Sequence, residues 1–465
     1  MAGVSPLGRS TIFPARYPSP IDPRSVLVSN PSHPDCRAII IVPARDEAVG
    51  IVGTLASLAR QCGPDGVPLD RRRFEIILLA NNCRDETATL ARAFARRQPG
   101  LALHVVERTL SQAEANVGTA RRLLMDEACR RLQANGKPRG VIASTDADTC
   151  PELTWLAAIL AAIDAGADAV GGRITTAAAS RAELDEGARR AHLRDVGYRF
   201  LVAEVESLLD PVACDPWPHH YQHFGASLAV TAEAYRRVGG LPRLPALEDV
   251  ALTMALVLAD ARVRHSPDVR VITSARTSSR AVRGFATQFR EWSAMHAEGV
   301  PLLVEAPASV VSRASQRRLL RELWHETRAG GTGSSSLWAR IGGLSGLPHG
   351  AVADALAAAA TVGQLALLVA RAQGRRTVFE PLGPPVKIEQ ATRELRRLLA
   401  RLRRVEPRLL PLEEVEPVGV RALSAEMAQD VAATAEKFLV DLVTVQRRII
   451  DRRRPVDQQE LAAGG

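Results

Sequence analysis

The stretch Val141-Ile-Ala-Ser-Thr-Asp-Ala-Asp-Thr149 places two carboxylates, one residue apart, directly after a short apolar run. The run is typical of a buried β-strand, so Asp146 and Asp148 are expected where that strand ends. Residues at the carboxyl end of a parallel strand face the crevice in which α/β proteins bind ligands. Hard divalent cations prefer oxygen ligands and often share them with substrate phosphates. An isolated pair is better explained as a solvated turn, so the rest of the chain decides.

Strands and helices are predicted to alternate on both sides of this stretch. The expected strands are 38–42, 74–79, 101–106, 140–144, 167–175, 224–230 and 269–273. The expected helices are 48–60, 86–97, 116–133, 151–165, 181–209, 232–238 and 248–258. This alternation implies right-handed crossovers and therefore a Rossmann-like α/β domain with a mainly parallel sheet.

Two flanking regions lack the alternation. Residues 1–36 are rich in Pro and Ser and are predicted to form an extended N-terminal arm. From residue 301 to residue 465, strand-like segments disappear and Arg, Leu, Ala and Glu dominate. Segments 389–405 and 424–451 have apolar residues at helical spacing, and a Gly-Ser break at 330–336 separates helices. We therefore expect an all-helical C-terminal region after an α/β domain that spans 37–300.

Composition excludes some functions and favours others. The 465 residues are 46% hydrophobic and 24% charged, which is ordinary for a soluble globular protein. The net charge of +9 favours an anionic substrate or an anionic membrane surface. No nucleic-acid-binding motif is present, and an aromatic content of 4% is poor for base stacking. We therefore expect no nucleic-acid partner.

Targeting and redox signals are weak. The six cysteines are scattered without metal-ligand spacing, which is typical of free thiols in a reducing compartment. The start of the chain lacks a basic-then-apolar signal pattern. The apolar stretch 351–370 is interrupted by Asp354 and Gln364, so a packed helix is expected there. We predict a cytoplasmic protein and leave peripheral membrane contact open.

Three further polar segments accompany Asp146-Ala-Asp148. They are Val42-Pro-Ala-Arg-Asp-Glu47, then Ala80-Asn-Asn-Cys-Arg-Asp-Glu-Thr87, and later Phe224-Gly-Ala-Ser-Leu-Ala229 with Val238-Gly-Gly-Leu-Pro242 and Leu247-Glu-Asp-Val250. In this order the segments resemble the motifs of the family 2 glycosyltransferases, which have the GT-A fold. That family carries a Pro-x-x-x-Glu loop, a Ser-x-Asp-x-Thr loop, an Asp-x-Asp metal motif and a Glu-Asp motif after a Gly-Gly turn. The resemblance covers roughly residues 38 to 280.

The resemblance implies an inverting hexosyltransferase with a nucleotide-diphosphate sugar as donor and a hydroxyl group as acceptor. Asp146 and Asp148 would hold Mg²⁺ or Mn²⁺, which would neutralise the departing diphosphate. Asp249 would be the general base, with Glu248 as an orienting neighbour or as the base if the register differs by one. The candidate nucleotide-binding residues are Pro43, Ala44, Arg45, Glu47, Asn81, Asp85, Arg121 and Asp146.

Departures from the family pattern leave parts of the site open. Asn81 stands where the family usually has Asp, so uracil and guanine are both compatible with the second loop. Residues 271–276 lack the His that often completes the metal shell, and His265 lies earlier. Arg121 or Arg122 is expected either to reach a phosphate or to be a solvated helix residue.

The segment 217–223 is rich in histidine and aromatic residues. Its three histidines, His219, His220 and His223, are expected either in a polar loop near the acceptor or in a metal site.

Two other functions compete with transfer of a sugar. A sugar nucleotidyltransferase on a related fold would need a Gly-rich first loop, and residues 42–47 contain no Gly. A nucleotide-sugar-binding scaffold without turnover would not need all four acidic motifs, yet the chain keeps them.

Overall fold

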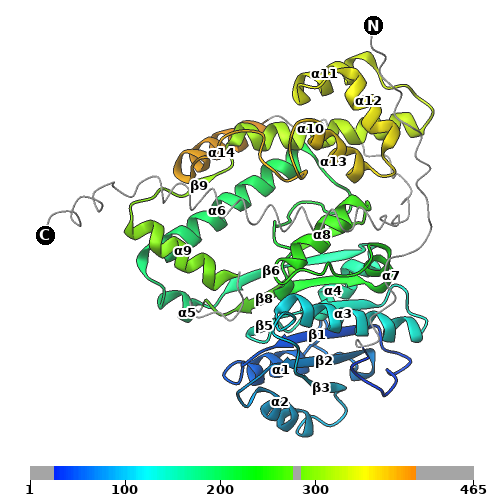
Figure 1. Cartoon of the computed structure of the whole chain (residues 1–465), viewed down its shortest axis with the longest axis vertical. Helices are drawn as coiled ribbons and strands as arrows, with labels where there is room; N and C mark the ends of the chain where they lie inside the picture. The colour runs from blue at the N-terminus through cyan, green and yellow to red at the C-terminus, as the bar shows by residue number, and fades with distance from the viewer. Residues whose placement is uncertain (1–25, 276–283, 405–465) are drawn as a thin grey trace, which may run out of the picture.

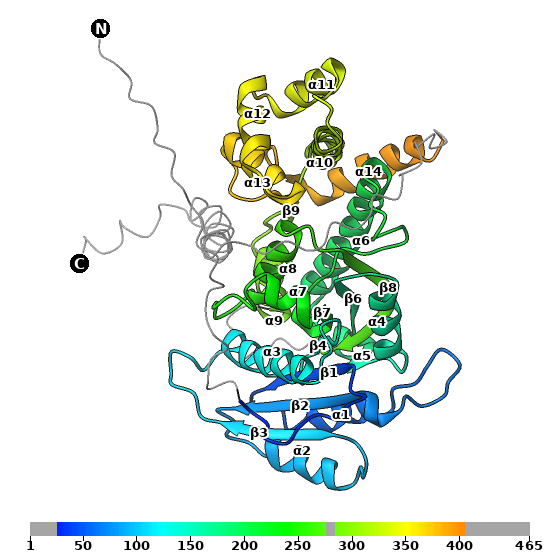
Figure 2. The same ribbon diagram turned by 90° about the vertical axis from the view of Figure 1, so that its right-hand side faces the viewer.

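The structure is a computed structural model of the 465-residue chain and describes residues 26–275 and 284–404. Most of the predicted N-terminal arm, the end of the family resemblance near residue 280 and the predicted helix 424–451 lie outside the described residues. Residues 26–36, the described part of the arm, contain no helix or strand. The α/β domain forms one end of the molecule and the C-terminal helices form the other, with α6 (Glu186–Leu209) reaching between them (Figures 1 and 2).

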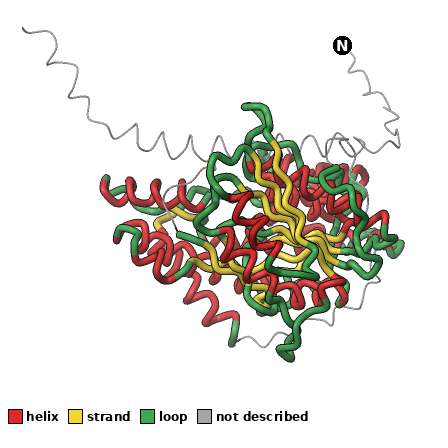
Figure 3. Tube along the Cα trace, turned by 90° about the horizontal axis from the view of Figure 1, so that it is seen from below, coloured by secondary structure: helices red, strands yellow, loops and turns green. Residues whose placement is uncertain are grey.

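An eight-stranded sheet forms the centre of the α/β domain (Figure 3). The strands lie in the order β3-β2-β1-β4-β7-β6-β8-β5, and β7 and β5 are antiparallel to their neighbours. Their bounds are β1 Ala38–Ala44, β2 Phe74–Asn81, β3 Leu103–Arg108, β4 Val141–Ser144, β5 Thr149–Pro151, β6 Ala169–Thr176, β7 Leu228–Thr231 and β8 Val263–Thr273. The predicted Rossmann-like domain of GT-A type is confirmed.

Helices cover both faces of the sheet. As a result, every residue of β1, β2 and β4 is buried. One face packs against α1 (Ile51–Ala59), α2 (Thr87–Arg96) and α4 (Trp155–Asp164). The other face packs against α3 (Val117–Ala134), α7 (Ala232–Arg237) and α8 (Glu248–Leu258). Alternate residues of each strand therefore serve two separate cores.

The remaining helices are α5 Ala178–Ala182, α9 Phe285–Ala297, α10 Pro307–Arg328, α11 Ser335–Ser345, α12 His349–Ala358, α13 Val362–Ala372 and α14 Ile388–Leu402. The C-terminal region is helical as predicted, except for a two-residue antiparallel pair, β9 (Leu303–Val304) and β10 (Val386–Lys387). None of the helices in the described ranges combines the length and apolarity needed to cross a bilayer.

The apolar stretch 351–370 forms two helices, α12 and α13, and not the single helix that was expected. Thr361 causes the break, because its hydroxyl accepts a hydrogen bond from Gln364 N at 3.1 Å and so caps α13. The same hydroxyl donates to Leu258 O, at the end of α8, over 2.6 Å. The start of α13 is thereby attached to the α/β domain.

Helix α6 joins the two regions through buried ion pairs. Glu206 contacts Arg313 of α10 at 2.8 Å, and Asp210 contacts Arg321 of α10 at 2.5 Å. Apolar side chains of α6, α10 and α14 form a shared cluster beside these pairs. The helical region is therefore docked on the α/β domain over a continuous interface.

Candidate active site

The acidic turn 146–148 lies just past β4, at the carboxyl edge of the parallel strands. The turn is held by Thr54 of α1, whose hydroxyl donates to Ala147 O over 2.9 Å. Gly50 lies so close that a side chain there would begin 3.5 Å from the Cα of Asp148. The first loop and the acidic turn therefore form one surface at this edge.

A buried guanidinium joins the acidic turn to the start of α8. Arg121, which is 4% exposed, donates from Nη2 to Asp146 Oδ1 over 2.6 Å and from Nη1 to Glu248 Oε1. Gly225 is required beside it, because a Cβ at this position would lie 2.4 Å from the guanidinium carbon. The pairing links residues that are 25 and 127 positions apart in the chain. A phosphate contact by Arg121 remains a prediction, and it would require the guanidinium to release one of these carboxylates.

The start of α3 explains why Arg121 reaches this position. Asn116 caps the helix by accepting a hydrogen bond from Thr119 N at 2.9 Å. Gly118 allows close approach, because a Cβ there would lie 1.8 Å from Leu244 O in the loop before α8. The next residue, Arg122, points elsewhere and donates to Leu241 O over 2.6 Å.

Asp249 is fixed by backbone amides on both of its oxygens. Its Oδ2 accepts a hydrogen bond from Gly225 N at 2.6 Å, and its Oδ1 accepts one from Val250 N at 2.8 Å. Leu247 sits in the left-handed region, with φ of 60°, and this turns the chain so that Glu248 and Asp249 begin α8. Carboxylates in the first turn of a helix are favoured by the helix dipole. The Asp249 carboxylate is 9% exposed and is held in one orientation.

Three carboxylates surround the buried guanidinium of Arg121. Burial alone would lower the pKa of Arg121, but Glu248, Asp146 and Asp249 raise it, so the guanidinium stays charged. Burial raises the pKa of Asp146, and Asp249 and Glu47 raise it further against the effect of Arg121. Glu47 of the first loop and Asp249 of α8 are therefore close enough to influence the same acidic residue.

Glu248 is expected to make stability depend on pH. Its pKa is raised from 4.5 to about 7, because burial and the nearby Asp249 raise it by more than Arg121 lowers it. The folded chain then binds this proton more tightly than the unfolded chain. Its contribution to the free energy of unfolding is full below about pH 4.5 and is lost as the pH rises to about 7.

Urea unfolding of Glu248→Gln should show a flatter pH dependence than the parent chain across this interval. The exposed Glu298 provides a matched control, and Glu298→Gln should keep the parent slope. Equal slopes in Glu248→Gln and the parent would contradict the raised pKa.

The first loop begins with buried backbone. Pro43 and Ala44 end β1 and are buried, and Asn81 ends β2 with 3% of its surface exposed. Arg45 donates to Ala115 O over 2.7 Å, toward the loop before α3. These residues lie at the edge where a nucleotide is predicted to bind, and their contact with a nucleotide remains a prediction.

Hydrogen bonds join the first loop, at the end of β1 (residues 42–47), to the second loop, at the end of β2 (residues 80–87). Glu47 N donates to Thr87 Oγ1 over 2.7 Å, and Ala48 N donates to Asp85 Oδ2 over 2.9 Å. Asp85 also accepts a hydrogen bond from Thr87 N at 3.0 Å. Asp85 and Thr87 thus shape the loop through contacts with backbone amides, and nucleotide binding by Asp85 stays a prediction.

Asp46, Cys83 and Asp85 bring three potential ligand atoms within 4.8 Å of one another. Hydrogen bonds account for this cluster, since Asp46 accepts from Arg84 N at 2.6 Å and the Cys83 sulfur accepts from Asp46 N at 3.3 Å. Burial raises the pKa of the Cys83 thiol, whereas metal binding needs the thiolate. In residues 26–275 and 284–404, no other three His, Cys, Asp or Glu side chains converge in this way.

The predicted metal ligands Asp146 and Asp148 therefore lack a third protein ligand of these types within the described part of the chain. His265 does not converge with these two residues, and its Nδ1 lies 2.8 Å from Asp215 Oδ2. Two half-buried carboxylates still offer the hard oxygen atoms that Mg²⁺ or Mn²⁺ prefers, and phosphate oxygens and water usually complete such a shell. The donor set fits a divalent cation that is shared with a diphosphate.

The histidine-rich segment does not build a metal site. His220 uses both ring nitrogens, with Nε2 3.0 Å from Ser266 O and Nδ1 accepting from Gln222 N at 3.0 Å. The rings of His219, His220 and His223 surround His265 at 5.9–6.4 Å between centroids. Of the two expectations, the polar loop fits this packing.

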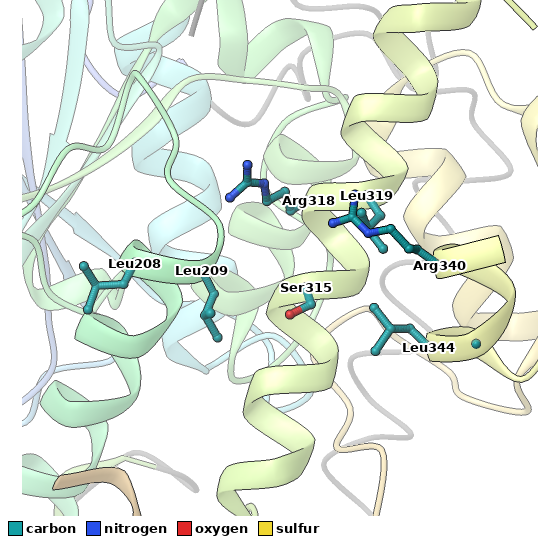
Figure 4. A pocket seen from close by; sticks show the side chains of 8 residues that line it. Leu208, Leu209, Ser315, Arg318, Leu319, Arg340 and Leu344 are labelled. Carbon is teal, nitrogen blue, oxygen red and sulfur yellow. The ribbon is translucent and has the colours of Figure 1, made fainter. Parts of the chain in front are cut away.

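A cavity of about 450 Å³ lies elsewhere, between the end of α6 and helices α10 and α11 (Figure 4). Leucines line it, together with Ser315, Gly343 and two arginines, Arg318 and Arg340. None of the acidic residues described above contributes to this cavity. It therefore belongs to the helical region and not to the site at the sheet edge.

The sheet order and the acidic turn after β4 define a GT-A glycosyltransferase domain. Residues 39–204 match the family described as glycosyl transferase family 2. This part of the chain is therefore a glycosyltransferase domain of the family 2 type, which is an enzyme domain.

Solved structures with a related fold have low identity to this chain. The mannosyltransferase PcManGT from Pyrobaculum calidifontis, in complex with GDP-Man and Mn²⁺, is 18% identical with a TM-score of 0.37 and 87% of each chain covered. TarS residues 1–349 from S. aureus, in complex with UDP-GlcNAc, is 14% identical with a TM-score of 0.38, covering 73% of this chain and 92% of that one. Glucosyl-3-phosphoglycerate synthase from Mycobacterium tuberculosis is 16% identical with a TM-score of 0.33, covering 59% of this chain and 84% of that one. No curated protein matches the chain.

Proposed function

We propose that this glycosyltransferase is inverting and metal-dependent, and that it moves a sugar from a nucleotide-diphosphate donor to a hydroxyl acceptor. One observation carries the proposal: the buried Arg121 binds Asp146 after β4 and Glu248 at the start of α8. The two motifs that the family resemblance assigns to donor and acceptor are thereby held at one edge of the sheet.

The donor would bind across the interlocked first and second loops. Glu47, Asp85 and Asp146 are brought to this edge by β1, β2 and β4, which are parallel and adjacent. Asp146 and Asp148 would hold the divalent cation, which would neutralise charge on the departing diphosphate. Arg121 keeps Asp146 oriented while that carboxylate serves the donor.

The acceptor hydroxyl would approach Asp249. A carboxylate offers about four lone-pair positions, and the amides of Gly225 and Val250 occupy two of them. The remaining positions can accept the acceptor proton as the oxygen attacks the anomeric carbon. Attack from the face opposite the diphosphate gives inversion.

The competing functions fit the site less well. A nucleotidyltransferase would need a flexible glycine loop over the phosphates, whereas Pro43 and Ala44 end β1 as buried residues. A scaffold without turnover would not need to hold Asp249 on two backbone amides.

We also propose a cytoplasmic location, with contact to a membrane surface as a secondary expectation. The basic side of α14 carries Arg396, Arg397 and Arg401, which could meet anionic head groups. Arg403 is already paired with Glu204 of α6.

Release of nucleoside diphosphate from a panel of UDP- and GDP-sugars tests the proposed function. We expect at least one donor to be hydrolysed slowly without acceptor when Mn²⁺ or Mg²⁺ is present, and hydrolysis to stop when EDTA is added. Pyrophosphate-dependent formation of a nucleoside triphosphate would instead indicate a nucleotidyltransferase. Binding of a nucleotide sugar with no release of diphosphate would indicate a scaffold.

A further inference from the structure

We propose that the acceptor is an anion, and that its phosphate or carboxylate group binds between Arg173 of β6 and Arg199 of α6. This inference rests on the proposed function, because it names the chemical class of the molecule that presents the hydroxyl to Asp249. A group of cationic and aromatic side chains from β6 and α6 gathers around Tyr221, which lies in the segment that leads to Gly225 and Asp249.

The segment 219–224 is fixed to the extended end of β6. The Gln222 side chain accepts a hydrogen bond from Ile174 N at 2.8 Å and donates to Ile174 O over 3.0 Å. Gly171 permits this contact, because a Cβ there would lie 2.4 Å from Gln222 O. Tyr221 and His223 are therefore held beside Arg173, the residue before Ile174.

Arg173 lies at the same edge of the sheet as the acidic turn. Gly171 is in register with Leu228 of β7, and Leu228 is in register with Ser144, the last residue of β4. Arg173 is two residues further along β6, so it extends past the level at which the acidic turn begins. Its position places a cation at the edge where donor and acceptor are expected to meet.

Two arginines flank a pair of aromatic rings. The Arg173 guanidinium lies 5.3 Å from the Phe200 ring centre, and the Arg199 guanidinium lies 5.5 Å from the Tyr221 ring centre. The two rings meet edge to face at 5.7 Å. The two arginines thus each contact one ring of a single aromatic pair, and guanidinium N–H groups suit a planar or tetrahedral anion.

The charges on this surface are not balanced. Arg199 pairs with Asp195 at 2.8 Å, whereas the Arg173 side chain contacts the Phe200 ring and makes no hydrogen bond or ion pair with any residue that the structure describes. Burial, together with the nearby His265, His220 and Arg199, lowers the pKa of His223 to about 3. An anionic group would restore the balance, because an unpaired guanidinium in a half-buried position lacks part of its solvation.

The surface is connected directly to the proposed base. Gly225, whose amide holds Asp249, follows Tyr221 by four residues and His223 by two. Extended chain covers about 3.3–3.6 Å per residue, so Tyr221 is at most roughly 14 Å from Gly225. This upper limit keeps the aromatic pair within reach of Asp249 for a single acceptor that carries both a hydroxyl and an anionic group.

Calorimetric titration with inorganic phosphate and, separately, with acetate tests the site. EDTA is added so that no cation recruits the anions to the acidic turn. We expect saturable binding of at least one anion, and Arg173→Gln should weaken it by about tenfold or more because a charged hydrogen bond is lost. Stronger binding of phosphate or of acetate distinguishes a phosphorylated acceptor from a carboxylated one.

Arg199→Gln is a second test variant, since its half-exposed side chain is less involved in folding. Arg190→Gln, on an exposed face of α6 where Arg190 pairs with Glu186, is the matched control and should bind the anions like the parent chain. Absence of saturable binding in the millimolar range, or equal affinity in Arg173→Gln, Arg199→Gln and Arg190→Gln, would overturn the proposal.

Failure of this inference can be told apart from failure of the proposed function. Slow donor hydrolysis by the parent chain reports on the proposed function and needs no acceptor. Hydrolysis without an anion site would overturn only the acceptor class. An anion site without hydrolysis of any donor would overturn the proposed function, and with it the assignment of the anion as an acceptor.

Discussion

Replacing Asp249 by Asn is expected to lower turnover by a factor on the order of 10²–10⁴, the usual loss when a general base is removed. The amide keeps the size of the side chain and can still accept a hydrogen bond from Gly225 N, which the carboxylate accepts at 2.6 Å. It cannot take up the proton of the acceptor hydroxyl. Donor affinity should change little, because the diphosphate is assigned to the acidic turn and not to Asp249. Steady-state rates with a saturating donor, together with calorimetry of nucleotide binding, measure both quantities.

The control for this variant needs care. Glu248→Gln is unsuitable as a mild control, since Glu248 is 1% exposed and pairs with the buried Arg121. Breaking such a pair usually costs about 3–5 kcal/mol of stability. Asp268, an exposed acid in β8, is the better match, and Asp268→Asn should keep the parent rate. Full activity of Asp249→Asn, or a product that retains the donor's anomeric configuration, would reduce Asp249 to a structural acid at the start of α8.

The sequence predicted the α/β core because the periodic signals there agree with tertiary packing. Continuous apolar runs such as 38–42 become strands buried on both faces, and β1 and β2 are separated by a helix as expected. The short edge strand β5 was not predicted. It has only three residues, and it pairs with β8 more than a hundred positions later, so no local pattern marks it.

The sequence predicted that the C-terminal region is helical, but it did not predict how the helices pack. Residue patterns indicate helices, yet they do not show that α10 and α14 pack on α6. That packing depends on pairs such as Glu206 with Arg313, which are separated by 107 positions. The break between α12 and α13 also follows from a distant contact, the Thr361 hydroxyl on Leu258 O.

The acidic residues of the site could be recognised in the sequence as motifs, whereas the position of Arg121 between them could not. Arg121 appeared there only as a candidate ligand for phosphate. Its bridge from Asp146 to Glu248 depends on two close backbone approaches, at Gly118 and at Gly225. Both glycines are present in the sequence, but a glycine alone does not show which residue will pack against it. Spatial partners of this kind require the fold.

Replacing Asp148 by Ala is expected to abolish the divalent-dependent part of nucleotide binding while leaving the fold intact. Asp148 follows β4 and is half-buried at the sheet edge, and its carboxylate would be one of the two predicted protein ligands to the cation. Loss of one hard oxygen ligand from so small a set should leave the cation too weakly bound to hold the diphosphate. Asp146 is a poorer choice for this test, because its removal also unpairs the buried Arg121.

Calorimetry with UDP and GDP, each in Mn²⁺ and in EDTA, gives the measurement. The parent chain should bind one of the two more tightly in Mn²⁺, and Asp148→Ala should show the EDTA affinity under both conditions. Cys83→Ala tests the rival cluster of Asp46, Cys83 and Asp85 without a change of charge, and it should keep the Mn²⁺ effect. If Cys83→Ala loses the Mn²⁺ effect and Asp148→Ala keeps it, the cation binds between the first two loops and not at the acidic turn after β4.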